Sequence, residues 1–128
     1  MNLLEEREYY KPFVYPWAFE KYKKQQQMHW LPDEVPLQDD IKDYNQKLSA
    51  DERLLIDNIF RFFTQADVDV CCGYAKHYLP TFKQPEIRMM LVSFAAMEAV
   101  HQEAYSLLLE TLGKSDDMYQ EFFDIQAM

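Results

Sequence analysis

The stretch PEIRMMLVSFAAMEAVHQEAYSLLLETLG, residues 85–113, decides the fold. Its many good helix formers, its proline at the start and its glycine at the end predict one helix from Pro85 to Leu112, with Gly113 just beyond it. At about 100° per residue, one face of this helix combines apolar and polar side chains. That face carries Phe94, Glu98, His101, Tyr105 and Leu108. A carboxylate on an apolar face needs a compensating partner, because burying it unpaired is costly.

A second long helix is expected before this one. Ser49 and Glu52 match a capping box, and an apolar periodic run continues to Leu79, where Pro80 is expected to stop it. The short connection PTFKQPE predicts that the two helices are antiparallel neighbours. The apolar stripe of this helix consists of Ile56, Phe60, Phe63, Asp67, Cys71, Tyr74 and Tyr78. Asp67 is the only acid of that stripe, and it is expected at the same depth as Glu98.

The remaining chain predicts shorter helices and an all-α fold. Residues 1–14 read as an extended arm, and residues 15–128 as one helical domain. Helices are expected over about 16–28 and 40–47, with another starting after Ser115. Only two glycines interrupt a sequence rich in Leu, Met, Ala, Glu, Gln and Lys, a composition that favours helix over sheet.

Composition and charge exclude several classes of protein. With 13 basic and 22 acidic residues, the formal net charge is −9, which argues against a nucleic-acid partner. No apolar run reaches the roughly 18 residues of a membrane span, and the acidic start lacks the order of a secretion signal. The adjacent Cys71 and Cys72 cannot easily bridge each other and are expected to be reduced and buried. We therefore expect a cytoplasmic protein that binds neither nucleic acid nor membrane.

Asp67, Glu98 and His101 together predict half of a metal site. Side chains at i and i+3 leave a helix on the same side, and Glu-x-x-His is how di-iron and di-manganese bundles supply two ligands. Other interpretations stay open from the residues alone. Glu98 and His101 could form a solvated or salt-bridged pair, Asp67 could cap or pair with a basic residue, and Tyr105 could be an ordinary core tyrosine.

The motifs MHWLPDEVPL, FFTQADVDV and MEAVHQEAYSLLLETLG, in this order, resemble the radical-generating small subunit of class I ribonucleotide reductase. The resemblance covers nearly all of the chain after the arm and implies a ferritin-like bundle. It implies that Asp67 is a carboxylate ligand of the first metal, Glu98 the bridging carboxylate and His101 the imidazole ligand of the first metal. It further implies that Tyr105 is the radical tyrosine and that Trp30 relays the radical to the large subunit. Phe60 and Phe94 would line the radical pocket.

The chain departs from this family in one respect. The family builds its site from four helices, and this chain supplies only three of the six protein ligands. His29 and His77 do not substitute for the missing ones. The resemblance implies a complementary C-terminal half that carries another Glu and a second Glu-x-x-His, and a natural split is favoured over a cut fragment. The acidic end of the chain points to the same partner, because Phe122, Phe123 and Ile125 need a surface to cover them.

The leading hypothesis is therefore the N-terminal part of a ribonucleotide reductase small subunit. Its expected cofactor is a dinuclear metal centre, with Fe/Fe favoured and Mn/Mn or Mn/Fe as alternatives. Its expected partners are the complementary half, the large subunit and a second small subunit. Two alternatives remain: a ferritin-like di-metal oxidase that acts on a bound organic ligand, and an inactive helical assembly module. The Asp at position 67 favours the reductase, since related oxidases carry Glu at the corresponding ligand.

Overall fold

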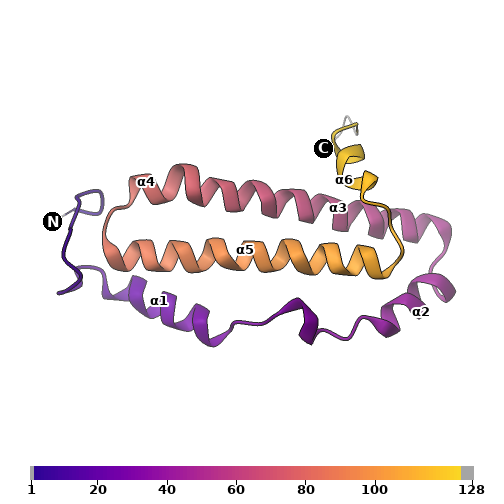
Figure 1. The fold of residues 1–128 in the computed structure, drawn as a ribbon, viewed down its shortest axis with the longest axis horizontal. Helices are drawn as coiled ribbons and strands as arrows, with labels where there is room; N and C mark the ends of the chain where they lie inside the picture. Colours follow the sequence, from indigo (N-terminus) through magenta and orange to yellow (C-terminus); the bar gives the residue numbers. More distant parts are fainter. Residues whose placement is uncertain (1, 125–128) are drawn as a thin grey trace. The chain divides into compact units, whose positions relative to one another are not determined.

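Every secondary-structure element in the described part of the chain is helical, which confirms the expected all-α fold. The computed structural model describes residues 2–124. Figure 1 shows the chain with its α-helices labelled. In chain order, the elements are α1 (Pro16–Gln27), η1 (Pro32–Glu34), α2 (Gln38–Gln46), α3 (Ala50–Gly73), η2 (Tyr74–Tyr78), α4 (Leu79–Thr81), α5 (Pro85–Thr111), α6 (Asp117–Glu121) and η3 (Phe122–Asp124). Within residues 2–124, no helix has the length and apolarity needed to cross a membrane.

The start of α3 follows the expected signal, and its end does not. The Ser49 N–H donates to the Glu52 carboxylate at 2.8 Å, and the Glu52 N–H donates to the Ser49 hydroxyl at 3.3 Å, which confirms the capping box. After α3 the chain continues as the π-helical segment η2, where the Leu79 N–H donates to the Tyr74 carbonyl. The next element, α4, includes Pro80. The expected stop before Pro80 is therefore wrong. A π-helical turn ahead of the proline accommodates a ring that would clash within a regular α-helix.

The end of α5 is a glycine cap, as the sequence predicts. Gly113 has φ of 76°, in the left-handed region. Its N–H donates to the Glu110 carbonyl at 2.9 Å, and the Lys114 N–H donates to the Leu109 carbonyl at 3.0 Å. These two bonds form a Schellman motif, which satisfies carbonyls at the helix end and directs the chain toward α6.

The described chain forms two compact units, each containing part of α3 and part of α5. The first unit comprises residues 1–30 and 69–99. In it α1 lies beside the first half of α5, as Figure 1 shows, and the contact is apolar. The buried residues of this core are Ala18, Ile87, Met90 and Leu91, with Tyr15, Tyr22, Tyr74, Leu79, Phe82 and Phe94 packed around them. The arm before α1 belongs to the same unit, where the Arg7 guanidinium pairs with the buried Glu86 carboxylate.

The second unit comprises residues 31–68 and 100–128. A polar cluster ties its elements together. The Tyr44 hydroxyl, on α2, donates to Asp57 on α3 at 2.8 Å, and the Lys114 ammonium donates to the same carboxylate at 2.6 Å. Phe122 packs against Phe62 of α3, with ring centroids 6.4 Å apart. Phe123 remains 71% exposed, so the expected need for a covering surface applies to it. Ile125 lies outside the described residues.

The two glycines predict opposite responses to substitution by alanine. Gly113→Ala is expected to lower the free energy of unfolding by about 1 kcal/mol or more, because an L-residue is strained in the left-handed region. Gly73→Ala is expected to raise it by up to about 1 kcal/mol, because Gly73 has helical φ and ψ of −60° and −42° and a Cβ there would meet no atom within 4 Å. Urea denaturation of both variants measures the difference, and equal changes would contradict the cap.

Glu86 predicts a pH-dependent contribution to stability. Burial raises the pKa of its carboxyl, but the Tyr15 and Glu86 backbone N–H groups and the Arg7 guanidinium together hold that pKa below its usual value of 4.5. The resulting stabilisation is fully present above the unfolded-state pKa and is lost as the pH falls through the folded-state pKa. We expect the difference in unfolding free energy between the wild type and Glu86→Gln to shrink below about pH 4.5. A difference that stays constant with pH would show that the charge of Glu86 contributes nothing.

Candidate metal centre

Helix α5 places Glu98 and His101 one turn apart on the same side. The segment around them is rich in Met, Ala and Leu, which favour a helix without distortion. Both side chains are half-buried. They are less enclosed than the apolar stripe in the sequence suggested. The i, i+3 spacing nevertheless puts a carboxylate and an imidazole within reach of one ion.

Helix α3 adds the third donor. Asp67, His101 and Glu98 each offer one ligand atom, and these atoms all lie within 4.8 Å of one another. Asp67 and His101 belong to the second unit, and Glu98 follows from His101 along the continuous helix α5. The side-chain amide of Gln102 donates to the backbone carbonyl of Asp67 at 3.2 Å, which holds α3 against α5 at this level. The predicted donors are thus brought together.

The donor set fits a hard or borderline divalent cation. Two carboxylates and one imidazole suit Fe, Mn or Zn better than the soft metals that prefer thiolates. Two donors that bind one ion at about 2.1 Å are at most about 4.2 Å apart. The present separation of up to 4.8 Å therefore requires a shift of well under 1 Å. The three donors together can hold one such ion.

The negative charge of Glu98 affects the pKa of a neighbouring tyrosine, Tyr74. Burial raises the pKa of Tyr74, and the Glu98 carboxylate and Tyr78 raise it further. Phe94 packs edge-on against Tyr74, with ring centroids 6.5 Å apart. Phe94 was expected to line a radical pocket, and its described contacts are with Tyr74 and with the apolar core of the first unit.

Tyr105 lies one turn beyond His101 on α5 and is half-buried. Its ring stacks on Phe63 at 5.8 Å with an interplanar angle of 20°, and it packs against Phe60 at 5.9 Å. Both partners come from α3 within the second unit. Two aromatic rings therefore shield the face of the phenol, as the sequence predicts for Phe60.

The other candidate residues lie at the ends of elements. Trp30 is half-buried in the segment between α1 and η1. His29 and His77 are exposed, and neither belongs to a ligand group within residues 2–124.

Gln102 was not predicted to take part, because helical periodicity places it away from the stripe. A hydrogen bond from a side-chain amide to a backbone carbonyl of another helix leaves no signal in the sequence.

Comparisons with a family model and with individual known proteins indicate the same family. The model of the family "Ribonucleotide reductase, small chain" matches residues 7–127. A probable ribonucleoside-diphosphate reductase small subunit of Invertebrate iridescent virus 6 is 51% identical over 128 residues, which are 100% of this chain and 36% of that protein. The ribonucleoside-diphosphate reductase small subunit of Dictyostelium discoideum is 33% identical over 113 residues, 88% of this chain and 33% of that protein. The chain thus spans about a third of the length of these relatives.

A solved structure shows the same fold. The ribonucleotide reductase Rnr4 homodimer of Saccharomyces cerevisiae matches with a TM-score of 0.84 over 97% of this chain and 41% of the yeast chain. The sequence identity is 21%, so this likeness concerns the fold alone.

The three donors predict metal affinity that depends on each of them. Asp67→Asn, Glu98→Gln and His101→Ala are each expected to weaken binding of Mn²⁺ or Fe²⁺ by at least roughly tenfold, because even outer groups of a metal site contribute 10- to 100-fold. The matched control is Glu103→Gln, which neutralises an exposed acid on the same helix. Anaerobic titration calorimetry on the full chain measures the affinity. Unchanged metal affinity in both Asp67→Asn and Glu98→Gln would show that these residues are not metal ligands.

Proposed function

Because this chain belongs to the ribonucleotide reductase small-chain family, we propose that it forms one side of a dinuclear metal centre that generates a tyrosyl radical. The meeting of the Asp67, Glu98 and His101 donor atoms within 4.8 Å is the observation that supports this most strongly. A helical packing module needs no such meeting of two carboxylates and an imidazole, since like charges placed together are unfavourable without a cation.

Each donor has its own role in the proposed centre. Asp67 and His101 would hold the first metal, and Glu98 would be a carboxylate ligand shared between the first metal and the second. Carboxylate oxygens with one imidazole per metal suit iron or manganese, and we favour a di-iron centre. When bound, the centre supplies the oxidising power of dioxygen. The hydrogen bond from Gln102 to the Asp67 carbonyl fixes the backbone that carries this ligand.

Tyr105 is the residue proposed to be oxidised. With dioxygen at the loaded centre as the oxidant, its phenol would lose one electron to that oxidant and one proton to the oxygen being reduced, which leaves a neutral radical. The rings of Phe63 and Phe60, at 5.8 and 5.9 Å, keep water and reductants from the ring face. Trp30 then serves in the relay that carries the oxidising equivalent to the large subunit, where ribonucleotides are reduced to deoxyribonucleotides.

The remaining ligands must come from outside this chain's described residues. A complete site of this type uses two further Glu and a second His, and the chain spans about a third of the length of its relatives. We propose that a complementary segment of the small subunit provides these ligands. Helix α3 offers it an apolar surface within the second unit, made by Leu55, Ile59, Phe62 and Phe63, which are 59%, 38%, 43% and 42% exposed. Apolar patches of this kind mark interaction sites. A second small subunit completes the proposed assembly.

The radical role is tested by electron paramagnetic resonance. The chain is assembled with the complementary segment, loaded with Fe²⁺ and exposed to dioxygen, and a tyrosyl signal is expected. Tyr105→Phe is expected to abolish the signal and leave the iron content unchanged, since a phenylalanine ring keeps the packing on Phe63. Tyr119→Phe, on α6 of the same unit, is the matched control and should retain the signal. An iron-loaded wild-type complex with no tyrosyl signal would rule out the radical role.

A further inference from the structure

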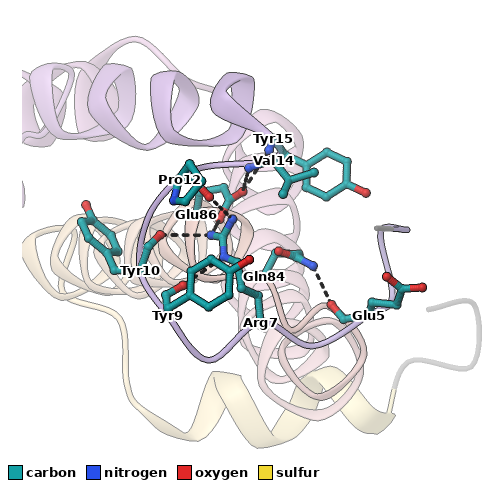
Figure 2. Close-up of polar contacts among 9 residues, drawn as sticks. All are labelled: Glu5, Arg7, Tyr9, Tyr10, Pro12, Val14, Tyr15, Gln84 and Glu86. Atoms are coloured by element: carbon teal, nitrogen blue, oxygen red, sulfur yellow. Dashed lines mark hydrogen bonds and ion pairs between the residues drawn. The ribbon is translucent and has the colours of Figure 1, made fainter.

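The arm before α1 is folded around one buried guanidinium. Arg7 Nε donates to the Tyr9 carbonyl at 3.0 Å, Nη1 to the Pro12 carbonyl at 2.6 Å and Nη2 to the Tyr10 carbonyl at 3.2 Å. Nη2 also pairs with the Glu86 carboxylate, as Figure 2 shows. Both charged side chains are 0% exposed. Arg7 thus closes the arm into a loop and connects that loop to the first turn of α5.

The same carboxylate caps α1. Glu86 Oε1 accepts hydrogen bonds from the Val14 and Tyr15 N–H groups, each at 2.9 Å. Tyr15 is the N-cap residue of α1, which has no side-chain cap of its own and no acid in its first turn. The hydrogen-bond acceptor at the N-terminus of a helix normally comes from its own Ser, Asp or Glu. For α1, a residue of α5 supplies this acceptor.

Helix α1 is too short to be stable without such contacts. It is 12 residues long with the sequence PWAFEKYKKQQQ, and helices of this length are marginal in water on their own. Its fully buried residue is Ala18, which packs on Ile87, Met90 and Leu91 of α5. Both the cap of α1 and the buried contact of Ala18 thus involve α5.

We propose that Arg7 and Glu86 form a clasp that makes the arm and α1 fold onto the start of α5 as one cooperative segment, residues 5–28. Breaking the pair leaves one charge buried without its partner, which is far more unfavourable than losing an exposed ion pair. The arm carbonyls held by Arg7 and the α1 cap provided by Glu86 are then lost together. The segment opens as a unit, and the rest of the chain stays folded.

Opening the clasp would also uncover apolar surface. Trp17 of α1 lines a pocket of about 120 Å³ together with Leu3, Phe82, Ile87, Met90 and Leu91. Ile87 and Leu91 are 3% and 7% exposed in the closed state. The segment therefore covers the first half of α5, and its opening exposes apolar side chains of the first unit to solvent.

Hydrogen–deuterium exchange of the full chain tests the clasp. In Arg7→Met, amides of residues 5–28 are expected to exchange roughly 100-fold faster or more, because breaking a buried pair has effects of that order. Amides of α2 and of residues 50–68 are expected to keep their wild-type rates. The matched control is Glu6→Gln, which breaks an exposed ion pair between the same arm and Lys83, with 3.4 Å between the charged atoms. This control should leave all rates within about twofold.

The double variant Arg7→Met with Glu86→Gln shows whether the two residues act as a pair. Since neither charge is then left uncompensated, the acceleration over residues 5–28 should be clearly smaller than the product of the two single-variant accelerations. Accelerations that multiply would contradict a clasp. So would wild-type exchange of the arm in Arg7→Met, or a loss of protection that spreads equally through α2 and α3.

Discussion

The alignment of α3 with α5 in the second unit is the constraint on which the proposed site depends. A slip of one residue turns a helical side chain by about 100°, which would take a donor out of reach of its partners. Two kinds of contact fix the alignment at the level of Asp67 and His101. Gln102 binds the Asp67 carbonyl, and the Tyr105 ring stacks on Phe63 one turn further along. A directional hydrogen bond and a large apolar contact thus select the same register, and the donors meet because of it.

Helix α5 carries two separate charged systems. Near its start, the Glu86 carboxylate is neutralised within the fold by Arg7 and by two backbone N–H groups. Further along, Glu98 stands beside Asp67 and His101, where the three side chains together offer donors for a cation. The same type of side chain therefore serves structure in one place and, in our proposal, chemistry in the other.

Local signals predicted much of this fold, whereas contacts between distant residues could be predicted only where helical periodicity indicated them. The Ser49–Glu52 capping box and the Gly113 cap depend on neighbours in sequence, so their motifs were readable. The grouping of Asp67 with Glu98 and His101 followed from helical periodicity and a short connection. The pairing of Arg7 with Glu86, 79 residues apart, has no sequence pattern, because any buried acid could have been the partner. The π-helical segment before Pro80 was missed for another reason: one extra residue in a turn leaves the helical pattern almost unchanged.

Pulsed electron paramagnetic resonance of the Mn²⁺-loaded protein tests whether His101 is a metal ligand in the assembled small subunit. With ¹⁵N-labelled histidine in this chain only, we expect a nitrogen coupling to the bound Mn²⁺. This coupling should persist when the exposed His29 and His77 are both replaced by glutamine, and it should vanish in His101→Gln. A coupling that survives in His101→Gln, or that is absent from the wild type at full metal loading, would contradict the assignment.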